Sequence, residues 1–221
     1  MKQLLFVQGH NTFSNHEVYE PIRAFCELHN IRVTFLRYDL NMDIRKVYRQ
    51  LCKQVVKYDY LAGHSMGGYF VMKLIVEHPE LISKLERCIL LMPLIVKDPL
   101  IDTICKIPFV RDLQLPKQLI YPSHKLSNNM NIFDNLDFHT KIPLKQIVDC
   151  YASMNDAETV VNTLNRNSNC RLIYAIDEKF TEIDLKVLNR IKHKCYVSGK
   201  HNCFMNPKSD FFDRFCETIF D

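Results

Sequence analysis

Six short apolar runs recur along the chain, at residues 4–7, 33–36, 58–62, 88–92, 172–175 and 195–197. Each has the length of a buried strand in a parallel sheet that is covered on both faces. Helical patterns lie between most of these runs, beginning near His16 and covering residues 43–57, 66–78, 181–191 and 207–220. Pro21 suits the first turns of the first helix, Pro79 is expected to end the third, and Pro207 to open the last. This alternation predicts βαβ units and therefore an α/β fold, with helices on both faces of a mainly parallel sheet.

The middle of the chain breaks this alternation. Residues 93–143 contain six of the nine prolines, together with apolar clusters that have neither strand nor helix spacing. We interpret residues 94–165 as an insertion of short helices and loops, and its place between two halves of a sheet is typical of a lid or cap. The whole chain, residues 1–221, has the length of one domain.

Composition narrows the class of protein. Hydrophobic residues make up 47% of the chain and charged residues 24%, which excludes a disordered or coiled-coil protein. The net charge of +4 is spread without a basic cluster, which argues against a nucleic-acid partner. No apolar run is long enough for a membrane span or a signal peptide. The nine cysteines include no Cys-x-x-Cys pair, so we expect free thiols, no metal site and a soluble protein in the cytoplasm.

The sequence Gly-His-Ser-Met-Gly stands at residues 63–67. It follows an apolar run and precedes a helical pattern, which is the context that a G-x-S-x-G nucleophile elbow requires. On such a sharp turn the hydroxyl of Ser65 stands clear of the sheet, while Gly63 and Gly67 let the strand and the helix pass closely. Gly9 and Gly199 also follow predicted strands, and would lie at the same carboxyl edge, where ligands bind.

On this elbow and its context the chain resembles the α/β-hydrolase superfamily, over residues 1–92 and 171–221. The resemblance implies the chain order nucleophile, acid, histidine. His201 follows the last strand in a segment similar to the family's G-x-H and would be the base that activates Ser65. Asp177 is the first carboxylate after the preceding strand and is the expected acid, with Glu178 as the alternative.

The oxyanion hole of such an enzyme needs two backbone N–H groups. The elbow assigns one to Met66, and residues 6–11 resemble the family's H-G-x segment, which assigns the other to the amide of His10. The His10 side chain either lines the pocket mouth or takes part in the chemistry, and His64 is expected to be structural. Phe13 and Phe204 lie near these loops and would either line an acyl pocket or belong to the core.

The chain opens at the strand before the oxyanion loop, so the family's first two strands are missing and we expect a minimal sheet of about six strands. The favoured function is a serine hydrolase that cleaves a carboxylic ester or a related acyl compound, a small molecule, without a cofactor or metal. Residues 171–184 also resemble the "GxxDxKF" stretch of the menaquinone-pathway lyases, although Ala175 stands where glycine is usual and the segment is one residue shorter. A non-hydrolytic enzyme is therefore one alternative, and a non-catalytic binding scaffold is another. The sequence predicts neither the individual substrate nor the oligomeric state.

Overall fold

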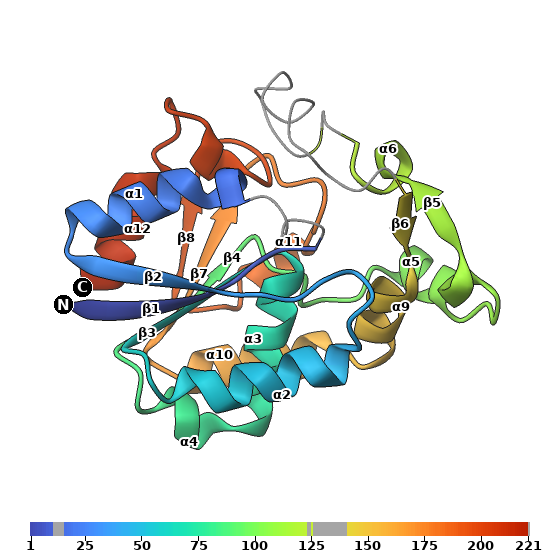
Figure 1. Cartoon of the computed structure of the whole chain (residues 1–221), viewed down its shortest axis with the longest axis horizontal. Helices are drawn as coiled ribbons and strands as arrows, with labels where there is room; N and C mark the ends of the chain where they lie inside the picture. Colours follow the sequence, from blue (N-terminus) through green and yellow to red (C-terminus); the bar gives the residue numbers. More distant parts are fainter. Residues whose placement is uncertain (11–15, 123–124, 126–140, 221) are drawn as a thin grey trace.

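The computed structural model describes residues 1–10, 16–122, 125 and 141–220. Six strands form one sheet in the order β2-β1-β3-β4-β7-β8, and every neighbouring pair is parallel (Figure 1). They are β1 (Lys2–Val7), β2 (Ile31–Leu36), β3 (Tyr60–His64), β4 (Arg87–Leu91), β7 (Cys170–Ala175) and β8 (Lys194–Val197). The predicted fold class and all six predicted strands are confirmed.

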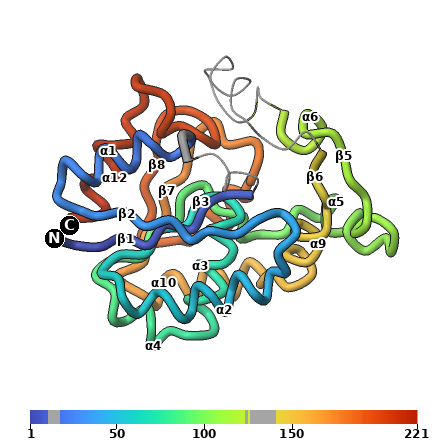
Figure 2. The backbone as a smooth tube through the Cα atoms, in the orientation of Figure 1, coloured from blue at the N-terminus to red at the C-terminus, as the bar shows by residue number. Residues whose placement is uncertain are grey.

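Helices cover both faces of this sheet (Figures 1 and 2). On one face lie α2 (Ile44–Val55), α3 (Met66–Glu77) and α10 (Ala157–Arg166), and on the other α1 (Glu20–Leu28) and α12 (Phe211–Phe220). Because successive strand residues point to opposite faces, Leu5 and Val7 join the first core while Leu4 and Phe6 join the second. The sheet is therefore buried on both sides, which explains why its strands are continuous apolar runs.

Pro79 follows the end of α3 and opens the one-turn helix α4 (Pro79–Ile82). The helices predicted over residues 181–191 and 207–220 are both shorter than expected. Within residues 181–191 only α11 (Leu185–Leu188) forms. The Thr181 hydroxyl donates to the Met92 carbonyl at 2.9 Å, and the Ile183 amide donates to the Tyr174 hydroxyl at 2.8 Å. The Tyr174 hydroxyl also donates to the Thr181 carbonyl at 3.3 Å, which is a group that a helix would bond internally, and these tertiary contacts hold the chain off a helical path.

The segment between β4 and β7 contains α5 (Pro99–Cys105), η2 (Val110–Asp112), β5 (Gln114–Pro116), α6 (Lys117–Ile120), β6 (Lys141–Pro143), α9 (Lys145–Ala152) and α10. The strands β5 and β6 pair antiparallel, and all of these elements except α10 gather beyond one end of the sheet (Figure 1). By contrast, α10 packs on α3 through Val160, Val161 and Leu164. The expected insertion 94–165 thus includes one helix that belongs to the sheet layers, and we call residues 94–152 the insert.

The remaining one-turn elements are η1 (His16–Tyr19), which precedes α1, and η3 (Cys203–Met205), which precedes α12. Pro21 stands in the first turn of α1, as expected. Among the described residues, no helix is both long and apolar enough to cross a membrane.

Candidate active site

Ser65 stands on the turn between β3 and α3 with a φ of 56° and a ψ of −121°. A positive φ is uncommon for a residue with a side chain, and the backbone around it is held by three hydrogen bonds. The Ser65 amide donates to the Leu91 carbonyl at 3.1 Å, and the Ser65 carbonyl accepts from the amides of Gly68 and Leu94, both at 2.9 Å. The turn therefore has the strained backbone that a nucleophile elbow requires, and main-chain hydrogen bonds offset its strain.

The two elbow glycines are required by the space available. A Cβ atom on Gly63 would lie 2.6 Å from the Gly67 carbonyl oxygen, and one on Gly67 would lie 2.0 Å from the Val7 carbonyl oxygen. A Cβ atom on Gly9 would lie 3.2 Å from the Cβ atom of Ser65. The loop after β1 therefore packs directly against the elbow, as an oxyanion loop must.

The amide of Met66 is the first of α3, since Ser65 is the residue that precedes the helix. The first amides of a helix have no acceptor within the helix, and the helix dipole makes this end favourable for negative charge. Ser65, Met66 and His10 line one cavity, so both expected oxyanion residues border the space next to Ser65.

Glu178 is the carboxylate that contacts His201. Its Oε2 accepts from Nδ1 of His201 at 2.8 Å, and its Oε1 accepts from the amides of Phe180 and Thr181 at 2.6 and 2.9 Å. Burial raises the pKa of Glu178, but the charge and the hydrogen bond of His201, with the two amides, outweigh this effect and lower the pKa below its usual value. The carboxylate thus stays ionised and keeps a proton on Nδ1, which leaves Nε2 able to accept one.

Asp177, the expected acid, is exposed, so the structure gives Glu178 in its place as the partner of His201. The reason lies in how far β7 and β8 stay together. Beyond the end of β7, the amide of Ile176 still donates to the Val197 carbonyl at 2.9 Å, and that of Asp177 to the Gly199 carbonyl at 3.0 Å. The chain turns inward only after these bonds, so the second carboxylate reaches the site.

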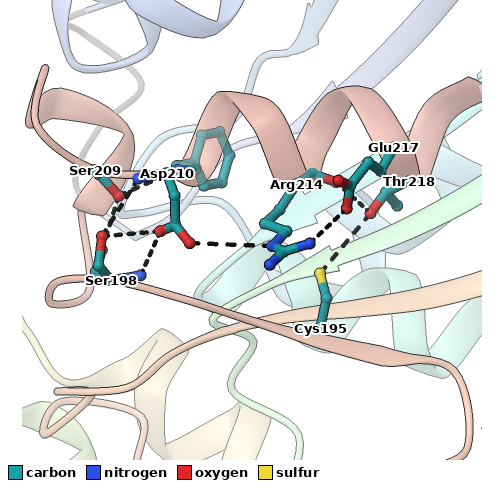
Figure 3. Close-up of polar contacts among 8 residues, drawn as sticks. Cys195, Ser198, Ser209, Asp210, Arg214, Glu217 and Thr218 are labelled. Carbon is teal, nitrogen blue, oxygen red and sulfur yellow. Dashed lines mark hydrogen bonds and ion pairs between the residues drawn. The ribbon is translucent and has the colours of Figure 1, made fainter.

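The loop that carries His201 is closed at its base by polar contacts between β8 and α12 (Figure 3). The amide and the hydroxyl of Ser198 donate to one oxygen of Asp210, at 2.6 and 2.8 Å, and the Ser209 hydroxyl donates to the Ser198 carbonyl at 2.7 Å. Gly199 has a φ of 110°, which favours glycine. Because Ser209 and Asp210 take part in this closure, α12 begins at Phe211 rather than at Pro207.

The His10 side chain is buried at the edge of the same cavity. Its Nδ1 contacts the hydroxyl of Tyr121, which comes from the insert, while its Nε2 has no hydrogen-bond partner among the residues that the structure describes. Burial lowers the pKa of His10 to about 3, so the ring is neutral. Tyr121 was not predicted, because nothing in its local sequence distinguishes it from other tyrosines.

Phe204 does not line this cavity. It is buried in the core beneath the elbow, with its ring 5.5 Å from that of Tyr19 and 5.1 Å from that of His64. Of the two expected roles, acyl pocket or core, Phe204 therefore has the core role. Phe13 lies outside the described residues. Among the described residues, no group of three or more His, Cys, Asp or Glu side chains is arranged to hold a metal ion.

The cavity next to Ser65 has a volume of about 370 Å³ and is mostly apolar. Its far wall comes from the insert, through Ile101, Ile104, Leu115, Ile120, Leu144 and Val148. On the sheet side it is bordered by Phe180 and Thr181, which follow Glu178. The volume lies near the lower end of the range typical of small-molecule sites, roughly 300–1,000 Å³.

No protein-family model matches the chain, and no curated protein matches it in sequence. Solved structures do match it. A structure reported for LipS and LipT, two metagenome-derived lipolytic enzymes, has a TM-score of 0.64 at 12% identity, covering 98% of this chain and 92% of the other.

Est1E from Butyrivibrio proteoclasticus, bound to ferulic acid, has a TM-score of 0.58 at 13% identity, covering 99% of this chain and 86% of the other. The thioesterase domain from the curacin biosynthetic pathway has a TM-score of 0.58 at 14% identity, covering 100% of this chain and 91% of the other. At these identities the likeness shows a shared fold.

Proposed function

Because the chain has the α/β-hydrolase fold, we propose that it is a serine hydrolase that cleaves a carboxylic ester or a related acyl compound. One observation carries the proposal: a buried Glu178–His201 pair comes from the ends of two strands beside an elbow that holds Ser65 at a positive φ. This arrangement supports the proposal, because a serine hydrolase needs a nucleophile, a base and an orienting carboxylate at one edge of the sheet.

The mechanism follows from these groups. Nε2 of His201 takes the proton of the Ser65 hydroxyl as its oxygen attacks the carbonyl carbon of the substrate. The negative charge that develops on the carbonyl oxygen is stabilised by the amides of Met66 and His10 and by the N-terminus of α3. His201 then protonates the leaving alcohol, and a water molecule, activated by the same imidazole, hydrolyses the acyl-enzyme. Glu178 stabilises the imidazolium throughout, and these steps use no metal or cofactor.

The lining of the cavity supports a substrate with an apolar acyl group. Its wall in the insert is mainly aliphatic, with Cys105, Tyr121 and Tyr151 among the other side chains, so the acyl group would be apolar and uncharged. The insert would act as a cap over this group and exclude water from the acyl-enzyme. The esterase and lipolytic neighbours support an ester as the substrate.

The test is hydrolysis of p-nitrophenyl esters of increasing chain length by the purified protein, measured by release of p-nitrophenol. We expect turnover that Ser65→Ala abolishes and that Ser83→Ala, a change at an exposed serine of another loop, leaves unchanged. Turnover that survives Ser65→Ala would refute the mechanism. Absence of turnover in the folded wild-type protein would favour a non-hydrolytic enzyme or a binding scaffold.

A further inference from the structure

Tyr19 and His64 join two of the active-site loops through a buried chain of hydrogen bonds. The amide of Gly9 contacts the Tyr19 hydroxyl at 2.8 Å, and this hydroxyl contacts Nδ1 of His64 at 2.8 Å. Nε2 of His64 contacts the main-chain carbonyl of His201 at 3.2 Å. All of these side chains are at most 2% exposed. This series of hydrogen bonds therefore runs from the oxyanion loop, through His64, to the loop of His201.

The two main-chain groups at the ends of this hydrogen-bond series, the Gly9 amide and the His201 carbonyl, fix the direction of each hydrogen bond in it. The carbonyl of His201 can only accept, so Nε2 of His64 carries a proton and donates it. In the neutral ring Nδ1 is then an acceptor, so the Tyr19 hydroxyl donates to it. The Gly9 amide can only donate, so the Tyr19 oxygen accepts from it. Each group has the one role that its neighbours require.

His64 is held in the neutral form that these hydrogen bonds need. Burial lowers its pKa well below the usual value, and the charge of His201, whose ring centroid is 4.7 Å away, lowers it further. Within the described part of the chain, the Tyr19 hydroxyl and the ring of Phe204 also face the ring, and neither would stabilise a charge on the imidazole as a carboxylate would. The ring can therefore bridge two loops without competing for the proton that His201 receives.

We propose that Tyr19 and His64 are positioning residues that set the distance between the oxyanion loop and the loop of His201 across the elbow. This inference rests on the proposed serine hydrolase. The Glu178 carboxylate orients the ring of His201, but nothing in that contact fixes its main chain, and His64 supplies this second anchor. Gly9 precedes the amide of His10, so the same bridge also aligns the second oxyanion donor. Rates are sensitive to such alignment, since a misplacement of 1 Å can cost about 100-fold.

The test compares His64→Leu, which removes both hydrogen bonds, with His64→Gln, whose amide can donate to the His201 carbonyl and accept from Tyr19. We expect His64→Leu to lower kcat by about 30-fold with KM within about threefold, and His64→Gln to recover at least about fivefold of that loss. Tyr19→Phe should lower kcat by about 10-fold. The matched control is Tyr69→Phe, which removes another buried hydroxyl, bonded to Ser153, and should leave kcat unchanged.

A purely structural role would lower stability without this pattern, so urea unfolding is measured for every variant. The inference is overturned if folded His64→Leu keeps the wild-type kcat, or if His64→Gln is as slow as His64→Leu. Imidazole nitrogen NMR tests it without any substrate. The wild-type protein should carry the His64 proton on Nε2, and Tyr19→Phe should shift the resonances of His201. A proton on Nδ1 of His64 would refute the bridge even if the proposed hydrolase activity were present, and its presence on Nε2 would support the bridge even if no ester were cleaved.

Discussion

At the carboxyl edge of the sheet, hydrogen bonds to main-chain atoms hold Ser65 and Glu178, whereas the insert borders the cavity mainly with apolar side chains. Ser65 is held by three backbone hydrogen bonds, and Glu178 by two amides besides His201. The insert contributes aliphatic side chains to the cavity, and its described polar contacts to the sheet layers are few, such as the hydrogen bonds from Nε2 of Gln146 to the Asp39 and Met42 carbonyls, both 2.6 Å.

The difference separates two properties of the site. Groups held by directional main-chain bonds tolerate little displacement, and they are the groups that the proposed reaction would need. Apolar contacts are not directional, so one aliphatic residue can replace another at small cost. We therefore expect changes at the sheet edge to alter rate and folding, and changes in the insert to alter the choice of substrate.

The largest expected effect tests the edge. Glu178→Gln keeps the shape of the side chain but removes the charge that stabilises the imidazolium, and should lower kcat by about 10⁴-fold. Asp177→Asn changes the neighbouring exposed carboxylate and should leave kcat within about threefold of wild type, as is usual for an exposed site without such contacts. Steady-state kinetics on one ester measures both. A larger loss in Asp177→Asn than in Glu178→Gln would restore the acid that the sequence favoured.

The next effect concerns folding at the same edge. Gly67→Ala would force a Cβ atom against the Val7 carbonyl, 2.0 Å away, so the helix must move off the sheet. We expect a loss of about 3–5 kcal/mol in the free energy of unfolding, measured with urea. Asn30→Ala is the control, since Asn30 also has a positive φ, 58°, on a turn between a helix and a strand. It should cost only about 1–2 kcal/mol, and an equal loss in both variants would contradict the close packing of the elbow.

Acid should destabilise the edge through its two buried neutral histidines. Burial lowers the pKa of His64 and that of His10, the latter to about 3, whereas the unfolded chain takes up protons near pH 6.5. The contribution of these two histidines to stability is therefore nearly constant well above pH 6.5 and falls as the pH drops through this value, by about 1.4 kcal/mol for each histidine between pH 7.5 and 5.5.

Urea unfolding at pH 7.5 and 5.5 measures this loss. His10→Phe should remove about half of the loss that the two histidines cause, while His29→Gln, at an exposed position, should leave it unchanged. A loss that is the same in all three proteins would show that other groups cause the acid sensitivity.

The smallest effect tests the insert. Val148→Phe fills part of the cavity from α9 and should lower kcat/KM for an octanoyl ester by about 10-fold, while the acetyl ester is cleaved as before. Leu113→Phe, at a partly exposed position of the insert outside the cavity wall, is the control. An equal loss for both esters would mean that the insert influences the reaction rather than the fit of the acyl group.

Most candidate site residues at the carboxyl edge of the sheet can be predicted from the sequence, because they obey local constraints. The elbow needs glycine on both sides of Ser65, and strand ends can be found from apolar runs, so Ser65 and His201 are found by position. The acid cannot be chosen this way, since Asp177 and Glu178 are adjacent and only the length of the β7–β8 pairing decides between them.

The rest of the site depends on contacts between distant segments. Tyr19 in η1 contacts His64, which is 45 residues away in the sequence, and Tyr121 in the insert contacts His10, which is 111 residues away. No local pattern marks either tyrosine. The same limit applies to residues 181–191, where hydrogen bonds to Met92 and Tyr174 override a helical pattern.

The first measurement is labelling with a fluorophosphonate, followed by mapping of the modified peptide. It tests whether Ser65 is a nucleophile whose activation depends on Glu178. The reagent phosphonylates a serine only when a base and an oxyanion hole activate it. We expect one adduct, on Ser65, that forms much more slowly in Glu178→Gln and at the wild-type rate in Asp177→Asn. A folded wild-type protein that forms no adduct, or forms it on another serine, would contradict the claim.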